Sequence, residues 1–565
     1  MQLKNPIIRR ALTLCLILIP LVLFGYTFQK YAINIPHWDD LAVRNSLAEF
    51  LTADSFSHKI SLLFSQHNEH RIVLTRLFAL LVFQLKGTLD LKLLMLLGNL
   101  SLVGILFLFY RFSRRNSLGL LALVPMTFLL FNQGLYENVF WGMASVQNFW
   151  VVLLAFVSLY FLVFSYDQPH KTYFYLAIAA SFAGTFTSSN GILIPIIGTA
   201  ILLFQKRYRE LGIWGVASAL FLFLYFFQYQ SSPDKTTKAD FSSPTLLLKG
   251  VLAVIGNAVD VSFVAPNKHL DLAMATGVLL LIILGWFSIQ VLIRKYNINQ
   301  RNNDLFLLGC LVFLGITCVG IAVGRLSYGI EVLLTSKYKI NSVLILCISY
   351  LIILNSLAEH RKPRVITIAI ALSICYNFYT YLAEFQHISY LRRERITDQF
   401  KIQHSDKEMP VSGIYARLQQ PAATFYDALM PALQSVKDTV QTKIGIVENE
   451  TGFILTDTRN DTLDISSADA GQYIVLKSDH NLYLFPCRTI TASAFQLKDY
   501  INIGFLFRNQ LNVGSFVSDF TKFYVQSGKY QIGTIDVENK KSMLTWTNQS
   551  INIQAVQKQK PVQNW

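Results

Sequence analysis

The chain has 565 residues, of which 53% are hydrophobic and only 15% are charged. Soluble globular proteins carry about 25% charged residues, so this composition excludes an ordinary soluble protein and favours one with many membrane spans. The formal charge of +15 does not indicate a nucleic-acid partner, because the Lys and Arg residues cluster in short loops between apolar runs, where they usually set membrane orientation.

Eleven apolar runs approach the roughly 20 residues that a membrane span needs, and they lie near 11–29, 91–110, 117–134, 145–166, 172–188, 191–205, 211–229, 272–293, 304–323, 340–358 and 365–383. The first run follows basic residues and no small-residue cleavage site comes after it, so we expect an uncleaved span. With the N-terminus in the cytoplasm, the five short inner loops are all basic, and the short outer turns near 135–144 and 189–190 carry neither Lys nor Arg. The positive-inside rule therefore predicts this orientation.

A first outer loop is predicted at about residues 30–90. Within it, the apolar stretch 72–85 is short and is interrupted by Arg76. We expect this stretch, and a second one at 245–264, to form helices that lie along the outer surface of the membrane without crossing it.

The chain changes character at about residue 385, where it becomes polar. A helix is predicted at 420–440, and the runs after it are short, alternating or β-branched and broken by Gly, Asn and Asp, which is typical of strands. The sequence therefore predicts a polytopic α-helical membrane domain over 1–384 and a β-rich domain outside the cytoplasm over 385–565, for which a sandwich is one candidate arrangement.

Five polar motifs fall on the predicted outer side of the membrane. They are "HWDD" (37–40), "QHNEHRI" (66–72), "YENVFWG" (136–142), "SSNGILIP" (188–195) and "GRLSYGIEVLLTSKY" (324–338). The inner loops hold basic residues but no comparable cluster. Because all five polar motifs fall on the same predicted side, we expect a single site at the outer surface.

Asp39 and Asp40 are the first candidate functional residues. Adjacent acids often begin a helix, where the dipole stabilises them, but Glu69 in the same loop favours a functional reading. Paired acids near a bilayer suit general-base work, because burial or a neighbouring charge raises one pKa. Together with Glu69 or His70, they are also candidates to hold a divalent cation.

His67 and His70 would share one face if their segment is a helix, a spacing that permits a metal site without requiring one. Arg71, Arg325 and Lys337 are candidate phosphate ligands, because Arg offers a planar fork and Lys a point charge. The structural alternative is that such basic side chains reach out to lipid headgroups.

Glu137 and Asn138 lie at the end of a predicted span, where an ionisable group is costly and needs a reason. Asn190 has a structural alternative, since it can cap the helix that follows. Tyr338 directly follows Lys337, just before the next span.

The order of these features resembles the GT-C superfamily of integral membrane glycosyltransferases. Its members take a sugar from a polyprenyl-phosphate carrier and pass it to an acceptor on the outer or lumenal face. In the superfamily an Asp or Glu of the first outer loop is the catalytic base or a metal ligand, and Asp39 and Asp40 match it. The strings "HNEHRI", "YENVFWG", "SSNG" and "GR…G…SKY" are also similar to those of bacterial proteins in this group, in which Ser-Arg-Tyr is common where Lys337 stands here. The resemblance covers roughly residues 1–385.

The resemblance implies an inverting displacement in which the carrier phosphate leaves C1 of the sugar. Asp39 or Asp40 would deprotonate the acceptor hydroxyl, and Glu69 or His70 would orient that carboxylate or help to hold a divalent cation such as Mg²⁺ or Mn²⁺. The implied donor-phosphate ligands are Arg71, Arg325, Lys337 and Tyr338. The implied supporting residues are His37, His67, His70, Glu137, Asn138 and Asn190.

The resemblance also implies a bacterial inner membrane protein whose partners are the lipid-linked donor, a glycan, lipid or protein acceptor and the bilayer. Two other classes compete with this interpretation. A transporter or flippase of lipid-linked glycans should carry ionisable residues at mid-membrane in repeated, broken helices, and few such residues and no repeat are found. A non-catalytic membrane scaffold would not need the acidic loop.

Overall fold

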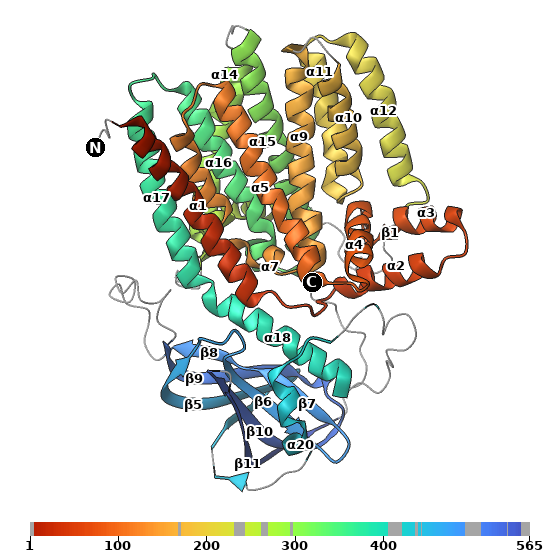
Figure 1. The fold of residues 1–565 in the computed structure, drawn as a ribbon, viewed down its shortest axis with the longest axis vertical. Helices are drawn as coiled ribbons and strands as arrows, with labels where there is room; N and C mark the ends of the chain where they lie inside the picture. The colour runs from red at the N-terminus through yellow and green to blue at the C-terminus, as the bar shows by residue number, and fades with distance from the viewer. Residues whose placement is uncertain are drawn as a thin grey trace. The chain divides into compact units, whose positions relative to one another are not determined.

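The computed structural model describes residues 5–167, 171–230, 243–261, 269–293, 298–404, 418, 421–434, 439–441, 443–491, 510–539 and 541–554. The chain forms two compact units. The first comprises Met1–Phe28 and Trp38–Ala383, and the second comprises Gln29–His37 and Glu384–Trp565. The first unit is helical and the second is mainly β (Figure 1).

The first unit is a bundle of apolar helices. Within the described ranges, eight helices are long and apolar enough to cross a membrane, so the chain has the helices of a membrane protein. They are α1 (Pro6–Tyr31), α5 (Leu91–Arg115), α9 (Trp150–Phe164, with helical turns from Gly142), α12 (Tyr208–Phe226), α14 (His269–Ile293), α15 (Ile298–Arg325), α16 (Lys339–Ser356) and α17 (Lys362–Ala383). In Figure 1 these helices run in roughly the same direction, and α15 contacts both α9 and α16.

The eleven predicted spans are therefore not all found as long helices. The run predicted at 117–134 is bent by 46° between Leu120–Leu130 and Gln133–Val139, and counting this pair as one span raises the total to nine. The runs predicted at 172–188 and 191–205 form the shorter helices α10 (Thr172–Thr185) and α11 (Leu193–Phe204), of 14 and 12 residues. Both fall short of the roughly 20 residues of a straight span.

At the bend, the side chains of Asn132 and of the distant Thr380 bind backbone groups. Oδ1 of Asn132 accepts the N–H of Gly134 at 2.7 Å, and its Nδ2 donates to the carbonyl of Leu129 at 2.7 Å. Thr380 accepts the N–H of Gln133 at 3.2 Å. These bonds satisfy backbone groups that a helix break would otherwise leave without partners inside the bundle. The chain then continues as η2 (Gln133–Leu135), α7 (Tyr136–Val139) and α8 (Gly142–Ala144).

The turn between α10 and α11 depends on a glycine. A Cβ on Gly191 would lie 1.9 Å from the carbonyl oxygen of Gly184, which is a severe clash with backbone. The turn "SSNG" forms η5 (Ser189–Ile192) at this close approach. Glycine is therefore required here to bring the end of α10 against the start of α11.

Helices also form at the two stretches that were predicted to lie on the membrane surface. They are α4 (Val73–Lys86) and α13 (Pro244–Gly256). The first packs with α2 (Asp40–Thr52) and α3 (Phe56–Phe64), and these three helices lie at the same end of the bundle as α7 and β1 in Figure 1.

The second unit contains two sheets around a shared core, so a β-rich C-terminal region is confirmed. One sheet has the order β3-β11-β10-β6-β7 and the other β4-β5-β9-β8. All pairs are antiparallel except β3–β11. The strands are β3 (Thr439–Val440), β4 (Gly445–Glu448), β5 (Gly452–Asp464), β6 (Gly471–Lys477), β7 (Leu482–Pro486), β8 (Arg488–Thr491), β9 (Gln510–Thr521), β10 (Gly528–Glu538) and β11 (Lys541–Ile553). Phe453 and Phe516 of one sheet share a buried core with Ile474 and Ile532 of the other.

The helices of the second unit differ from the prediction. The longest is α18 (Phe385–His404), which packs on β7 and was not predicted. Its buried side mixes Ile396 and Phe400 with Arg393 and Arg395, so it lacks the apolar stripe that normally reveals a helix. Of the predicted helix at 420–440, the described part shows two short turns, η11 (Phe425–Leu429) and α20 (Met430–Leu433).

A first test concerns the contact between α13 and α14. A Cβ on Gly277 of α14 would lie 2.1 Å from the carbonyl oxygen of Leu252, whereas a Cβ on Gly285 of the same helix would meet nothing within 4 Å. We expect Gly277→Ala to destabilise the protein by about 1–3 kcal/mol, because the two backbones must separate. Gly285→Ala is the matched control and should be neutral or slightly stabilising. Thermal unfolding in detergent measures both, and equal effects would contradict the close packing.

Candidate active site

The "HNEH" motif is a β-hairpin and not a helix, so the helical spacing considered for its histidines is not realised. Strands β1 (Gln66–His67) and β2 (His70–Arg71) pair antiparallel, with His67 directly opposite His70. Asn68 adopts a positive φ of 48° at the tip, a conformation that Asn tolerates better than most residues. Directly opposite residues share a face of the pair, so the hairpin brings the two rings together.

Arg71 anchors this hairpin to the end of α12. Its Nε donates to the carbonyl of Tyr225 at 2.6 Å and its Nη2 to the carbonyl of Phe227 at 2.5 Å, while Nη1 donates to the carbonyl of Phe64. The hydroxyl of Tyr225 in turn donates to the carbonyl of Glu69 at 3.1 Å. The guanidinium therefore satisfies carbonyls at helix ends, and this placement favours a structural role for Arg71 over the predicted phosphate contact.

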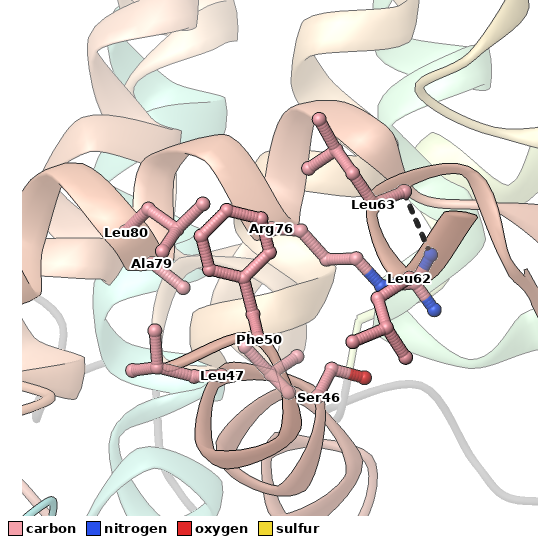
Figure 2. Close-up of a pocket in the computed structure, with 9 residues that line it drawn as sticks. Ser46, Leu47, Phe50, Leu62, Leu63, Arg76, Ala79 and Leu80 are labelled. Atoms are coloured by element: carbon pink, nitrogen blue, oxygen red, sulfur yellow. Dashed lines mark hydrogen bonds between the residues drawn. The ribbon is translucent and has the colours of Figure 1, made fainter. Parts of the chain in front are cut away.

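Arg76, like Arg71, donates to backbone carbonyls at the end of α3. It is 7% exposed, and its Nη1 donates to the carbonyls of Leu63 at 3.0 Å and Ser65 at 2.5 Å. Burial is the main cause that lowers its pKa to about 10. Figure 2 shows this side chain in a small, mainly apolar pocket between α2, α3 and α4. The pocket volume of about 10 Å³ corresponds to roughly one water molecule, so this pocket does not accommodate a sugar.

The two adjacent acids of "HWDD" have different surroundings. Asp40 is fully buried, and its Oδ1 accepts the N–H of Met143 at the start of α8 at 2.8 Å. Asp39 keeps 20% of its side chain exposed, and its Oδ1 lies 3.6 Å from Nε2 of His67. Asp40 therefore joins α2 to α8, whereas Asp39 is the acid that reaches solvent beside the hairpin.

Glu69 at the hairpin tip forms an ion pair with Arg325. Oε1 of Glu69 lies 3.0 Å from Nη2 of Arg325, the last residue of α15. Arg325 also makes a side-chain hydrogen bond with Tyr338. The carboxylate and the guanidinium are 25% and 29% exposed, so the pair is partly open to solvent. It connects the loop between α1 and α5 with the segment that follows α15.

His70 is held as a neutral ring. Its Nδ1 accepts the backbone N–H of Ser189 at 3.1 Å, so the proton of the neutral ring lies on Nε2. That nitrogen is 4.0 Å from Oε1 of Glu69. The pKa of His70 is lowered to about 4, mainly by burial, with contributions from His67 and Arg325, although Glu69 acts in the opposite direction. The ring is therefore uncharged near neutral pH.

Glu137 and Asn138 contact the backbone of the "SKY" segment, η10 (Ser336–Tyr338). Oε2 of Glu137 accepts the N–H of Lys337 at 2.7 Å, and Nδ2 of Asn138 donates to the carbonyl of Lys337 at 2.8 Å. The ammonium of Lys337 lies 5.3 Å from the ring centroid of Tyr338. These motifs, 200 residues apart, therefore meet directly.

Asn190 and His37 lie elsewhere. Nδ2 of Asn190 contacts Oγ1 of Thr317 on α15 at 3.3 Å, which ties the "SSNG" turn to that helix. His37 belongs to the second unit and is 6% exposed. Its pKa lies well below the ordinary range, because of burial and then the charge of Arg395.

The sequence-predicted residues thus separate into two groups. A continuous chain of contacts links one group, namely Asp39, His67, His70, Glu69, Arg325, Tyr338, Lys337, Glu137 and Asn138. Asp40, Arg71 and Asn190 instead bind neighbouring elements. The backbone N–H of Ser189 was not predicted as a partner of His70, because no side-chain pattern reveals which amide a histidine will meet.

The predicted acids do not fit a divalent cation. Across the described residues, no group of three or more His, Cys, Asp or Glu side chains is arranged to hold a metal ion. Asp40 binds a backbone amide and Glu69 binds Arg325, so two of the candidate carboxylates already have partners of another kind. Ca²⁺ and Mg²⁺ need several oxygen ligands around one point, and we therefore assign no metal role to this cluster.

A second test concerns the protonation of His70. Since its folded pKa of about 4 lies below the ordinary value of about 6.5, the unfolded state binds more protons between these values. The stability that neutral His70 contributes is thus complete above pH 6.5 and declines as the pH falls towards 4. We expect His70→Gln, whose amide can replace both ring nitrogens, to remove roughly 1–2 kcal/mol of the stability difference between pH 6.5 and 5. Chemical unfolding of both proteins at the two pH values checks this, and identical pH dependence would contradict the neutral ring.

Comparison of the chain with protein-family models, with curated proteins and with solved structures found no match. Any function assigned to this protein must therefore be argued from the contacts, burial and charge of its own residues.

Proposed function

We propose that this chain is an inverting glycosyltransferase of the outer face of a bacterial inner membrane. It would move a sugar from a polyprenyl-phosphate carrier to a hydroxyl group of a glycan, lipid or protein acceptor. The proposal rests chiefly on one observation, the partly exposed carboxylate of Asp39 in the same cluster as Arg325 and Lys337. A base and cations for a phosphate leaving group are the two chemical requirements of such a transfer.

Asp39 is the proposed general base. It differs from Asp40 in being partly exposed, whereas Asp40 is fully buried and accepts the amide of Met143. In the proposed reaction, the acceptor hydroxyl oxygen forms a bond to C1 of the sugar and gives its proton to Asp39. The bond between C1 and the phosphate oxygen breaks, and the electron pair leaves with the phosphate. His67, 3.6 Å from Asp39, supports the orientation of the carboxylate.

Lys337 is the proposed first contact of the carrier phosphate. Among the described residues its ammonium has no carboxylate partner, and it lies 5.3 Å from the centroid of the Tyr338 ring. Arg325 is already paired with Glu69 at 3.0 Å, so it can bind a phosphate only by exchanging or sharing that partner. A cation without a counter-ion in a partly buried site attracts an anion more strongly than a compensated one.

A third test separates the two acids. Asp39→Asn removes the base and should lower transfer by at least about 100-fold, which is the usual contribution of general-base catalysis. Asp40→Asn retains an oxygen that can accept the N–H of Met143 and should keep most of the activity. Membranes carrying each variant are incubated with a polyprenyl-phosphate sugar and extracted cell glycans, and transfer is measured. Undiminished transfer by well-folded Asp39→Asn would exclude the proposed base.

A fourth test addresses the membrane orientation. A reporter enzyme that is active only outside the cytoplasm is fused after the last residue of the full chain. We expect an active reporter, because the short basic loops predict that the site and the C-terminal unit face outwards. A matched fusion after Arg115, at the opposite end of α5 from the site, should be silent. A silent C-terminal fusion that is stably expressed would contradict the proposed orientation.

A further inference from the structure

Four hydrogen bonds join residues 134–138 to η10, the segment that contains the proposed phosphate ligand Lys337. Besides the two bonds from Glu137 and Asn138 to Lys337, the hydroxyl of Ser336 donates to the carbonyl of Gly134 at 2.8 Å and accepts the N–H of Glu137 at 3.2 Å. The four bonds join α7 and the turn before it to η10, across 200 residues of sequence. Both backbone groups of Lys337 are thereby occupied by side chains of α7.

Asn138 is itself held in one orientation. It is fully buried, and its Oδ1 accepts a hydrogen bond from Nδ2 of Asn148 at 2.8 Å. The carboxamide therefore cannot rotate to exchange donor and acceptor without losing two bonds. Its Nδ2 must point to the carbonyl of Lys337. The hydrogen bond from α7 therefore fixes the position of the η10 backbone.

We propose that Glu137 and Asn138 are positioning residues that act through Lys337, an inference that rests on the proposed function. They fix the backbone from which the flexible lysine side chain starts, and they thereby hold its ammonium beside Tyr338, where a phosphate would meet both groups. A lysine has high conformational entropy, and a fixed starting point reduces the amount that must be lost when an anion binds. Neither residue needs to touch the substrate.

This role predicts a specific pattern of substitution effects. Glu137→Gln keeps an oxygen that can accept the N–H of Lys337 and should be mild. Asn138→Asp replaces the donor to the carbonyl of Lys337 with an acceptor, and the two oxygens then repel each other. Its effect should therefore approach that of Lys337→Gln, which removes the ammonium itself.

The experiment measures binding of undecaprenyl phosphate to the purified full chain in detergent. We expect Lys337→Gln and Asn138→Asp each to weaken binding about 10-fold and Glu137→Gln about 2- to 3-fold, with the double variant Asn138→Asp/Lys337→Gln no weaker than Lys337→Gln alone. That non-additivity is the signature of a residue acting through another. Losses that multiply in the double variant would overturn the inference, as would unchanged binding by Asn138→Asp. In turnover assays the positioning role raises KM for the donor more than it lowers kcat.

A matched control tests for general disruption. Asn99 on α5 is also buried, and its Nδ2 donates to the carbonyl of Val139, adjacent in sequence to Asn138, at 3.0 Å. Asn99→Asp makes the same chemical change at a side chain that binds the carbonyls of Met95 and Val139 and not that of Lys337. This variant should bind the lipid phosphate like the parent chain. Equal weakening by Asn99→Asp and Asn138→Asp would overturn the inference.

If Asn138→Asp does not fold, the same cycle is run with Glu137→Ala, which removes the acceptor for the Lys337 amide. Absence of binding by the parent chain would reject the donor assignment as well, whereas parent binding that Asn138→Asp leaves intact would reject the positioning role alone.

Discussion

The requirement to satisfy backbone groups at helix ends organises the candidate site. In an apolar bundle, an unpaired amide or carbonyl costs several kcal/mol, and each helix leaves such groups at both ends. Here the polar motifs provide many of the partners. Asp40 accepts the amide of Met143, Arg71 binds three carbonyls, and Glu137 and Asn138 bind both backbone groups of Lys337. Much of the polar chemistry at this end of the bundle therefore maintains the helix ends.

The side chains that do not bind backbone groups at helix ends are the ones available to contact a substrate. Asp39 is partly exposed beside His67, and the ammonium of Lys337 lies beside the ring of Tyr338. Glu69 and Arg325 compensate each other. The carboxylate of Glu137 accepts the backbone N–H of Lys337. In the proposed reaction, the ammonium of Lys337 is therefore the cation that would first attract an entering phosphate.

The structure also explains why charge alone misled the assignment of single residues. Arg71 was a candidate to meet phosphate or lipid headgroups, yet it donates, like Arg76, to carbonyls around the end of α3. An arginine has five donors in a planar fork, which suits helix carbonyls as well as phosphate. The choice between these partners depends on which backbone groups lie within reach, and sequence spacing does not record that.

The sequence by itself determined the features that depend on local composition. Long apolar runs correspond to the long helices, and alternating runs after residue 440 correspond to strands, because hydrophobic periodicity is a property of neighbouring residues. The shared location of "HNEH", "YEN" and "SKY" at one end of the bundle could also be inferred, since it follows from the distribution of basic residues among the loops. Breaks such as the one at Asn132 could not be counted correctly, because they depend on partners like Thr380 that are remote in the chain.

Only the tertiary structure decided how the polar residues divide their roles. Asp39 and Asp40 are adjacent and chemically identical, but one turns to His67 and the other to the amide of Met143, about 100 residues away. Long-range contacts likewise accompany the neutral state of His70 and the helix α18, which was not predicted from the sequence. The hairpin form of "HNEH" was also seen only in the structure. The physical reason is common to all of them, because burial and hydrogen-bond partners are set by the packing of distant segments, whereas a sequence pattern specifies only which side chains are present.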